Sequence, residues 1–337
     1  MNPTPMTAPD RSEQRLAFLR QSLCDEGLEL ERASTDAGFR SYWRAVRGEY
    51  SWIVMDAPPG LEDLGSWLRM RELLASGGVR VPQVLARDLD AGFLLLEDLG
   101  SKTLLDEITS QSAEAWFDAA TDQLLRVQSI PCPADLPSYD DALLRRELSL
   151  FDEWYLDRHL GLELGPADRE RLAAGYDALV NAALDQPRVL VHRDFMPRNL
   201  MPVDGGLAVL DFQDAVRGPI AYDPLCLFKD AFVSWPEALV GRWLENYRSR
   251  AEQLGLPVPD GRRFRRDVDL IGVHRHLKVL GIFARLRHRD DKPRYLADAP
   301  RFIGYLEAVL PRHPELQPLA ELFAHTLRPQ LVAREGA

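Results

Sequence analysis

Cysteine is scarce in this sequence, and long uninterrupted apolar runs are missing. The three cysteines, Cys24, Cys132 and Cys226, are far apart and form no C-x-x-C pair, which argues against a disulfide framework or a zinc site. No apolar run is long enough to span a bilayer. The first ten residues contain three prolines and no apolar core, so they are not expected to be a signal peptide or an anchor. We therefore expect a cytoplasmic protein in which residues 1–11 are flexible.

Blocks of basic residues are also missing. Lysine and arginine total 41 against 52 aspartates and glutamates, which gives a formal net charge of −11. A chain of this kind is not expected to bind nucleic acid or an anionic membrane as its main partner. The acidic balance does not exclude a small anionic ligand, because a bound metal ion and a few local cations decide such an interaction.

The order of the predicted elements indicates two lobes. Segments typical of strands lie before Gly100, at residues 40–46, 52–55, 84–86 and 93–96, together with helices from residue 12 and at 61–75. After Gly100 the periodic segments are helical, at residues 113–127, 140–158, 166–184, 237–254 and 264–287. We expect an α+β, bilobal architecture with a small β-rich N-lobe at residues 12–98 and a larger helical C-lobe at 99–337.

One charged loop stands out between two short apolar runs. It holds His192, Arg193, Asp194 and Asn199, and a turn at residues 204–206 then leads into an apolar run that ends on Asp211. Strand, loop, strand, turn and strand in this order direct two carboxylates and one amide at a small volume. The pattern matches the H-R-D-x-x-x-x-N catalytic loop and the metal-binding aspartate of kinases.

Phosphoryl transfer explains why these residue types are used. A carboxylate must orient the acceptor hydroxyl and take its proton, which suits Asp194, and hard oxygen ligands must hold Mg²⁺ against the phosphates, which suits Asn199 and Asp211. Arg198 could stabilise charge on the transferred group, or form a salt bridge to Asp214. A surface turn with Asp194 paired to a neighbouring arginine is the alternative, but the complete set favours catalysis.

Two further segments are candidates for binding ATP. The small residues around Ser34 and Thr35 precede two strands, where backbone N–H groups could contact phosphates, although a plain hairpin loop fits equally well. A buried strand runs into Glu97 and Leu99 through a short polar link. This link resembles the hinge at which kinases hold adenine with main-chain groups, and an ordinary strand end is the alternative.

The segment from His192 to Asn199 together with Asp211 resembles the aminoglycoside phosphotransferase family, whose members are small-molecule kinases with a bilobal protein-kinase-like fold. Within that family, residues 55–59, 93–100 and 211–232 are most similar to the bacterial anomeric kinases of N-acetylmuramate and N-acetylglucosamine. The resemblance implies transfer of a phosphoryl group from ATP, with Mg²⁺, to the anomeric hydroxyl of an amino sugar in peptidoglycan recycling. It also implies that a sugar-1-phosphate uridylyltransferase uses the product.

The sequence departs from the kinase pattern at one strand. The lysine that usually pairs with the α- and β-phosphates has no counterpart, because Met55 stands where it would fall and Asp56 follows it. Arg44 or Lys102 could supply the missing charge. An inactive pseudokinase would show the same gap, yet the three residues expected to carry out catalysis are all retained.

Three polar residues that follow the charged loop are candidates for contacts with the acceptor. Asp214 and Asp223 could accept hydrogen bonds from sugar hydroxyls, although Asp223 could instead cap a helix at Pro224 or brace the catalytic loop. His274 shares a predicted helix face with Lys278 and could bind the lactyl carboxylate of N-acetylmuramate, unless that face is simply solvated. Aminoglycosides, choline and homoserine remain alternative substrates, and a non-catalytic nucleotide-binding module is the alternative from another class.

Overall fold

The structure is a computed structural model that describes residues 10–34, 39–229 and 232–335. The chain divides into two compact units: unit 1 comprises residues 1–109 and 198–213, and unit 2 comprises residues 110–197 and 214–337. The boundary expected between residues 98 and 99 falls inside unit 1, and the segment expected to be catalytic passes from unit 2 to unit 1 after Pro197. Most of the N-terminal stretch expected to be flexible lies outside the described residues.

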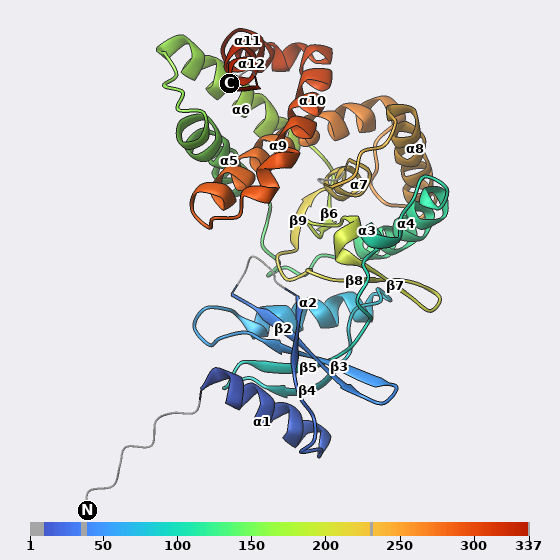
Figure 1. Ribbon diagram of the computed structural model, residues 1–337. Coiled ribbons are helices and arrows are strands. Elements are labelled where there is room, and N and C mark those ends of the chain that lie inside the picture. Colours follow the sequence, from blue (N-terminus) through green and yellow to red (C-terminus); the bar gives the residue numbers. More distant parts are fainter. Residues whose placement is uncertain (1–9, 35–38, 230–231, 336–337) are drawn as a thin grey trace, which may run out of the picture. The chain divides into compact units, whose positions relative to one another are not determined.

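Unit 1 is built on a five-stranded antiparallel sheet with the strand order β1-β2-β3-β5-β4 (Figure 1). A two-residue turn joins β2 to β3, because Arg47 pairs with Tyr50, and its Gly48 has a φ of 62°. The turn before β5 requires Gly92, because a Cβ there would lie 2.2 Å from the carbonyl oxygen of Ala57. The strands are β1 (Glu31–Ser34), β2 (Ser41–Arg47), β3 (Tyr50–Asp56), β4 (Val84–Asp88) and β5 (Phe93–Glu97).

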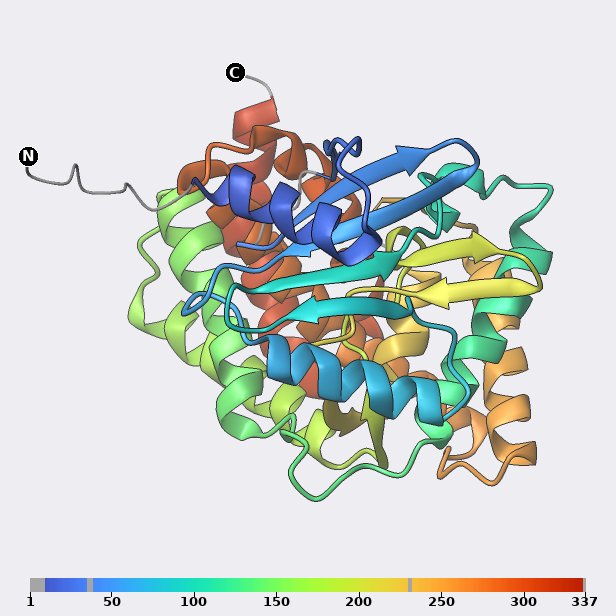
Figure 2. The same ribbon diagram turned by 90° about the horizontal axis from the view of Figure 1, so that it is seen from below.

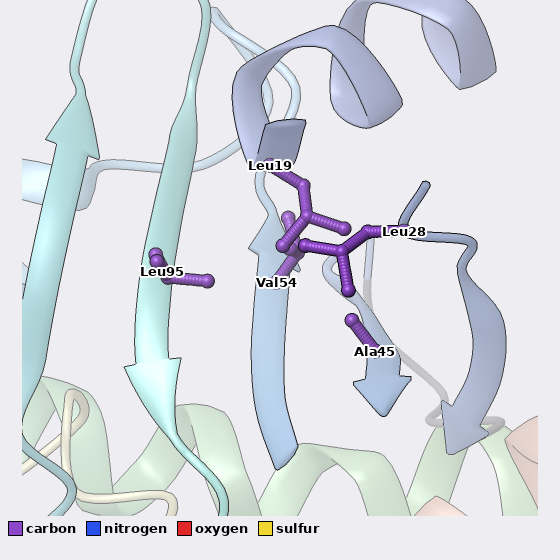
Figure 3. Packing of buried hydrophobic residues seen from close by; sticks show 5 residues of the cluster. All are labelled: Leu19, Leu28, Ala45, Val54 and Leu95. Carbon is purple, nitrogen blue, oxygen red and sulfur yellow. The ribbon is translucent and has the colours of Figure 1, made fainter. Parts of the chain in front are cut away.

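Two helices cover this sheet. The helix α1 (Arg11–Leu23) packs on one face, where Leu19 meets Val54 and Leu95 in a small buried cluster with Leu28 and Ala45 (Figures 2 and 3). The alternation of side chains along β3 explains this packing, since every second residue points to the same face. The helix α2 begins at Leu64 rather than at the expected residue 61, because Asp63 caps it by accepting a hydrogen bond from the backbone N–H of Gly65.

A second hairpin belongs to unit 1. Strands β7 (Leu200–Val203) and β8 (Gly206–Val209) pair across the two-residue turn Asp204–Gly205, as the sequence predicts. The N–H of Val209 donates to the carbonyl of Arg80 at 2.7 Å, and Phe212 packs against Trp67 of α2 with ring centroids 5.1 Å apart. These contacts fix the residues that follow β8 within unit 1.

Unit 2 is mainly helical and is organised around α9 (Gly261–His288). This 28-residue helix contacts α5, α6, α7, α8 and α10, and most of its side chains are therefore buried. Strands β6 (Arg188–Val191) and β9 (Val216–Pro219) form a short antiparallel pair that ends at the catalytic loop. The helices expected from periodicity are all present: α4 (Ala113–Ser129), α5 (Asp141–Leu150) with a π-helical continuation (Phe151–His159), α6 (Pro166–Leu184), α8 (Glu237–Gln253) and α9.

Short helices separated by prolines complete the C-terminal part of unit 2. They follow the turn Pro293–Asp298 and comprise α10 (Ala299–Val309), α11 (Gln317–Leu322) and α12 (Arg328–Glu335). Two further helices are short: α3 (Leu104–Glu107) belongs to unit 1 and α7 (Tyr222–Phe228) belongs to unit 2. Among the residues that the structure describes, no helix combines the length and the apolar character needed to cross a membrane.

Candidate active site

A buried carboxylate shapes the catalytic loop of unit 2. The backbone N–H groups of His192 and Arg193 donate to the two oxygens of Asp223, at 2.7 and 3.0 Å. Arg193 has a φ of 76°, which lies in the left-handed region that residues other than glycine rarely adopt. The two hydrogen bonds hold this conformation immediately before Asp194, and such backbone strain is typical of functional sites.

Asp223 is therefore a brace for the loop, which corrects the expectation that it contacts the sugar. Its side chain is fully buried, and both oxygens already accept hydrogen bonds from the main chain. Burial raises the pKa of Asp223 to about 6, although the nearby His192 and the backbone donors act against the increase. It is also the second residue of α7 and not its cap, so only the bracing role left open by the sequence is found.

Asp194 combines partial exposure with nearby positive charge. Its side chain is 38% exposed, and its Oδ1 atom lies 3.8 Å from the guanidinium of Arg275, which is itself buried. Burial acts to raise the pKa of Asp194, but the cations Lys278 and Arg275 outweigh it and lower the pKa. The carboxylate is therefore ionised at neutral pH and able to accept a proton or a hydrogen bond from a ligand.

A buried ionic network lies behind the loop. The carboxylate of Glu147 pairs with the guanidinium of Arg193 and, at 2.9 Å, with the ammonium of Lys278, and it accepts a hydrogen bond from Tyr139. Burial alone would raise the pKa of Glu147, but the two cations hold it at about 2. The hydroxyl of Tyr222 accepts a further hydrogen bond from Lys278 at 3.3 Å. Because each charge has a partner, the network is rigid and Arg193 is held from its side chain as well as from its backbone.

His274 is buried within unit 2, so the expectation that it binds a substrate carboxylate is wrong for this structure. Its Nε2 atom lies 3.1 Å from the carbonyl oxygen of Leu144, and burial lowers its pKa to about 4, which leaves the ring neutral. The solvated-face alternative is wrong too, since Lys278 points into the ionic network. Asp214 is exposed, and its carbonyl accepts a hydrogen bond from Arg193 at 3.3 Å, so its carboxylate stays a predicted sugar contact.

In unit 1 the hairpin brings Asn199 and the end of β8 together. The N–H of Leu210 donates to the carbonyl of Asn199 at 2.9 Å, so Asn199 lies opposite the residue that precedes Asp211. Asp211 has a φ of 59° and a side chain that is 46% exposed, and its Oδ1 accepts a hydrogen bond from Gln213 at 2.9 Å. One amide and one carboxylate supply hard oxygen ligands for Mg²⁺, which commonly completes its shell with water and phosphate oxygens. The described residues contain no cluster of three or more His, Cys, Asp or Glu able to hold a metal, so no metal site made of such side chains alone is found among them.

Sequence reasoning missed Arg40, which lies beside Asp211. Its Nη2 atom is 3.8 Å from Oδ1 of Asp211, and its Nε atom is 3.5 Å from the carboxylate of Glu62. The side chain is only 16% exposed. The sequence gives only a weak indication that Arg40 belongs to a site, because an arginine just before a strand is common.

Arg44 is engaged elsewhere in unit 1. Its guanidinium binds both carboxylate oxygens of Asp98, at 2.6 and 3.0 Å, and donates to the carbonyl of Gly100 at 2.7 Å. The hydrogen bonds to Asp98 raise the pKa of Arg44 further. Arg44 thus ties β2 to the segment that follows β5, and its expected contact with a nucleotide phosphate is not supported by this geometry. Lys102 is exposed and pairs with Glu107 at 2.8 Å.

The other residues predicted to bind the nucleotide lie at the ends of strands. Glu97 ends β5, and its carboxylate is bound by the guanidinium of Arg80, which lowers the pKa of Glu97. Leu99, two residues further along the chain, is half-buried, and Ser34 ends β1. Thr35 lies outside the described residues. These positions agree with main-chain roles at Glu97 and Leu99, which stay predictions.

The remaining expected residues have structural surroundings that can be stated briefly. Arg198 is half-buried in the single turn Pro197–Asn199. Met55 is fully buried, and Asp56 is bound by Arg11 at 2.6 Å and by Arg15 at 2.7 Å. Trp235 and Trp243 pack edge to face with centroids 5.6 Å apart, which is typical of a core. Trp235 also lines a cavity of about 60 Å³, far below the size of ordinary ligand pockets.

The chain is similar to known proteins in both sequence and fold. The sequence pattern described as the phosphotransferase enzyme family matches residues 29–268. An N-acetylmuramate/N-acetylglucosamine kinase from Pseudomonas aeruginosa is 53% identical over 297 residues, which cover 88% of each chain. The fold is similar to that of choline kinase LicA from Streptococcus pneumoniae, with a TM-score of 0.65 at 16% identity, over 89% of this chain and 100% of the other.

An ADP-bound aminoglycoside phosphotransferase has the same fold, with a TM-score of 0.60 at 15% identity, over 92% of this chain and 98% of the other. At such low identities these two structures establish the fold alone, which is the bilobal protein-kinase-like fold expected from the sequence. Membership of a family is established by the match over residues 29–268 and by the 53% identical relative. The chain belongs to the phosphotransferase enzyme family.

Proposed function

We propose that this protein is an ATP-dependent sugar kinase that phosphorylates the anomeric hydroxyl of N-acetylmuramate and N-acetylglucosamine. The observation that carries the substrate is the 53% identity, over 88% of both chains, to a kinase named for these two sugars. The reaction type is supported by the ionised Asp194 on a loop held by Asp223. It is also supported by Asn199, whose carbonyl accepts a hydrogen bond from the N–H of Leu210, the residue before Asp211. The ADP bound by a protein of the same fold supports a nucleotide as the phosphoryl donor.

Asp194 acts on the acceptor in this proposal. Its carboxylate accepts a hydrogen bond from the anomeric hydroxyl, orients that oxygen towards the γ-phosphorus, and takes the proton as the new P–O bond forms. The bond between the γ-phosphorus and the β–γ bridging oxygen breaks in the same step, and ADP leaves. Its lowered pKa makes it a weak base. A weak base is sufficient because phosphoryl transfer proceeds through a loose transition state, in which positioning contributes more than early deprotonation.

Asn199 and Asp211 would hold Mg²⁺ through their side-chain oxygens. The ion, when bound, neutralises charge on the β- and γ-phosphates. We assign adenine contacts to main-chain groups of Glu97 and Leu99, and phosphate contacts to Ser34 and Thr35. Stabilisation of charge on the transferred group is assigned to Arg198. Asp214 accepts a hydrogen bond from a sugar hydroxyl.

The product is a sugar 1-phosphate, which a uridylyltransferase can use as its substrate. Recycled peptidoglycan sugars and ATP meet in the cytoplasm, where we place the reaction. The three free cysteines Cys24, Cys132 and Cys226 agree with a reducing compartment.

A coupled assay tests the substrate. ADP release is followed with ATP, Mg²⁺ and either N-acetylmuramate or N-acetylglucosamine, and the product is identified as the 1-phosphate by phosphorus NMR. Turnover on both sugars is expected. Turnover on choline, homoserine or an aminoglycoside, with none on either sugar, contradicts the proposed substrate.

Replacing Asp194 with asparagine tests the reaction. We expect kcat to fall about 10²- to 10⁴-fold, as for the loss of a general base, with the Kd for ATP changed less than about threefold. Asp157→Asn, which changes an exposed carboxylate of unit 2, serves as the matched control. A protein that retains its biological activity in the Asp194→Asn form would instead be a non-catalytic nucleotide-binding module.

A further inference from the structure

The strand that carries a phosphate-binding lysine in related kinase folds carries none here. Met55 occupies the position and is fully buried, and the neighbouring Asp56 is bound by the arginines Arg11 and Arg15 of α1. A nucleotide bound for phosphoryl transfer nevertheless places several negative charges in one small volume. Some other cation of unit 1 must therefore face the phosphates.

Two cations suggested by the sequence are already committed. Arg44 forms a two-pronged pair with Asp98 and donates to the carbonyl of Gly100, with all three distances at 3.0 Å or less. Moving this guanidinium to a phosphate would leave the carboxylate of Asp98, which is 3% exposed, without its partner. Lys102 is 70% exposed and pairs with Glu107, so its ammonium is solvated and not fixed in direction.

Arg40 differs from both in its surroundings. Its guanidinium lies between the carboxylates of Glu62 and Asp211, at 3.5 and 3.8 Å. Both distances exceed that of an ordinary N–H···O hydrogen bond, so neither ion pair with a described residue occupies the donors of Arg40 as a short hydrogen bond would. The side chain is 16% exposed, which means that its direction is fixed by packing.

We infer that Arg40 is the cation that binds the nucleotide phosphates in place of the missing strand lysine, and that Glu62 positions it. This inference rests on the proposed function. It follows from the position of Arg40 beside Asp211, because a metal ion held by Asp211 also binds phosphate oxygens, and these oxygens then come within reach of the guanidinium. A half-buried arginine with loose partners gains short, charge-assisted hydrogen bonds when a phosphate arrives.

Glu62 has a separate part in this arrangement. It lies directly before Asp63, the residue that caps α2, so its backbone is held by the start of that helix. Its carboxylate faces Nε of Arg40 and leaves the terminal nitrogens of the guanidinium directed elsewhere, one of them towards Asp211. Glu62 is a positioning residue, since it acts only through Arg40.

Nucleotide binding to the full-length protein tests the inference without reference to turnover. Isothermal titration calorimetry with Mg²⁺ measures the Kd for ATP, ADP and adenosine. For Arg40→Ala we expect the Kd for ATP to rise about 10- to 100-fold, as for the loss of a hydrogen-bonded charge, with a smaller rise for ADP. The Kd for adenosine, which has no phosphate, should change less than about twofold. Arg40→Lys keeps the charge but loses the planar fork, so an intermediate Kd is expected.

Three further variants separate the alternatives. Arg47→Ala removes the last residue of β2, the strand that Arg40 directly precedes. Arg47 pairs with Asp25, and its loss should leave all three Kd values unchanged. Glu62→Gln should weaken ATP binding in the wild-type background but add nothing in the Arg40→Ala background, because its effect passes through Arg40. Arg44→Ala is the rival: if it weakens ATP but not adenosine, while Arg40→Ala leaves ATP binding unchanged, the inference is overturned.

The results distinguish this inference from the proposed function. A wild-type protein that binds neither ATP nor ADP contradicts the proposed function itself. A wild-type protein that binds ATP normally, with Arg40→Ala and Arg40→Lys both at the wild-type Kd, overturns only the assignment of Arg40. Thermal unfolding without nucleotide accompanies each titration, and Arg40→Lys supplies the decisive Kd if Arg40→Ala is unfolded.

Discussion

Replacing Asp223 with asparagine is a direct test of how the catalytic loop is held. The wild-type carboxylate accepts two hydrogen bonds, from the N–H groups of His192 and Arg193, and is fully buried. The amide of asparagine has one oxygen and one NH₂ group, so one of the two backbone N–H groups then faces another donor. Losing one hydrogen bond to a charged, buried acceptor costs about 2 kcal/mol.

The stability change should be visible in thermal unfolding. With roughly 2.1 cal/mol/K of unfolding entropy per residue, a chain of this size has about 0.7 kcal/mol/K, so the midpoint should fall by about 3 °C. The same substitution releases the left-handed conformation of Arg193, whose φ is 76°. Asp194 then shifts, and a displacement of about 1 Å at a catalytic group is enough to lower kcat about 100-fold.

The assay combines calorimetric unfolding, kcat with N-acetylmuramate, and the Kd for ATP. We expect kcat and the midpoint to fall while the Kd changes less than about threefold, because Asn199, Asp211 and Arg40 belong to unit 1. Asp157→Asn is the control for loss of an exposed carboxylate. If Asp223→Asn keeps both the wild-type kcat and the wild-type midpoint, the reasoning that a buried carboxylate shapes the loop is refuted.

Two more predictions concern stability. The pKa of Glu147 is about 2 in the folded protein and about 4.5 when unfolded, so its pairing with Lys278 and Arg193 stabilises the fold above pH 4.5, and this stabilisation, roughly 3 kcal/mol, is lost as the pH falls towards 2. Unfolding midpoints measured across this range should show the decrease in the wild type and a smaller one in Glu147→Gln; equal slopes would contradict it. Gly281→Ala should destabilise by about 2 kcal/mol or more, because its Cβ would lie 2.3 Å from the backbone of Leu150. The control Gly304→Ala, whose Cβ would meet no described atom within 4 Å, should unfold at or above the wild-type midpoint.

The sequence by itself determined the features that depend on residues close to one another along the chain. Helices α4, α6, α8 and α9 follow from apolar periodicity, and the hairpin β7–β8 follows from two short strands around Asp204–Gly205. Asp194 and Asn199 are predicted to be site residues because their spacing within one loop is a local pattern. The predicted hairpin likewise determines the position of Asp211, because the pairing of two strands determines where the second strand ends.

Only the tertiary structure decided which charged groups meet. Asp223 lies 31 positions from His192 in the chain, and Lys278 lies 131 positions from Glu147. A sequence pattern gives no sign of such pairs. It leaves Asp223 open between a sugar contact, a helix cap and a brace for the loop, and it allows a substrate contact at His274, although both side chains are buried. Arg40 and Arg44 lie four residues apart in the chain. Their different roles come from the partners that folding supplies, because a charge becomes tightly paired or available to a ligand according to what packs beside it.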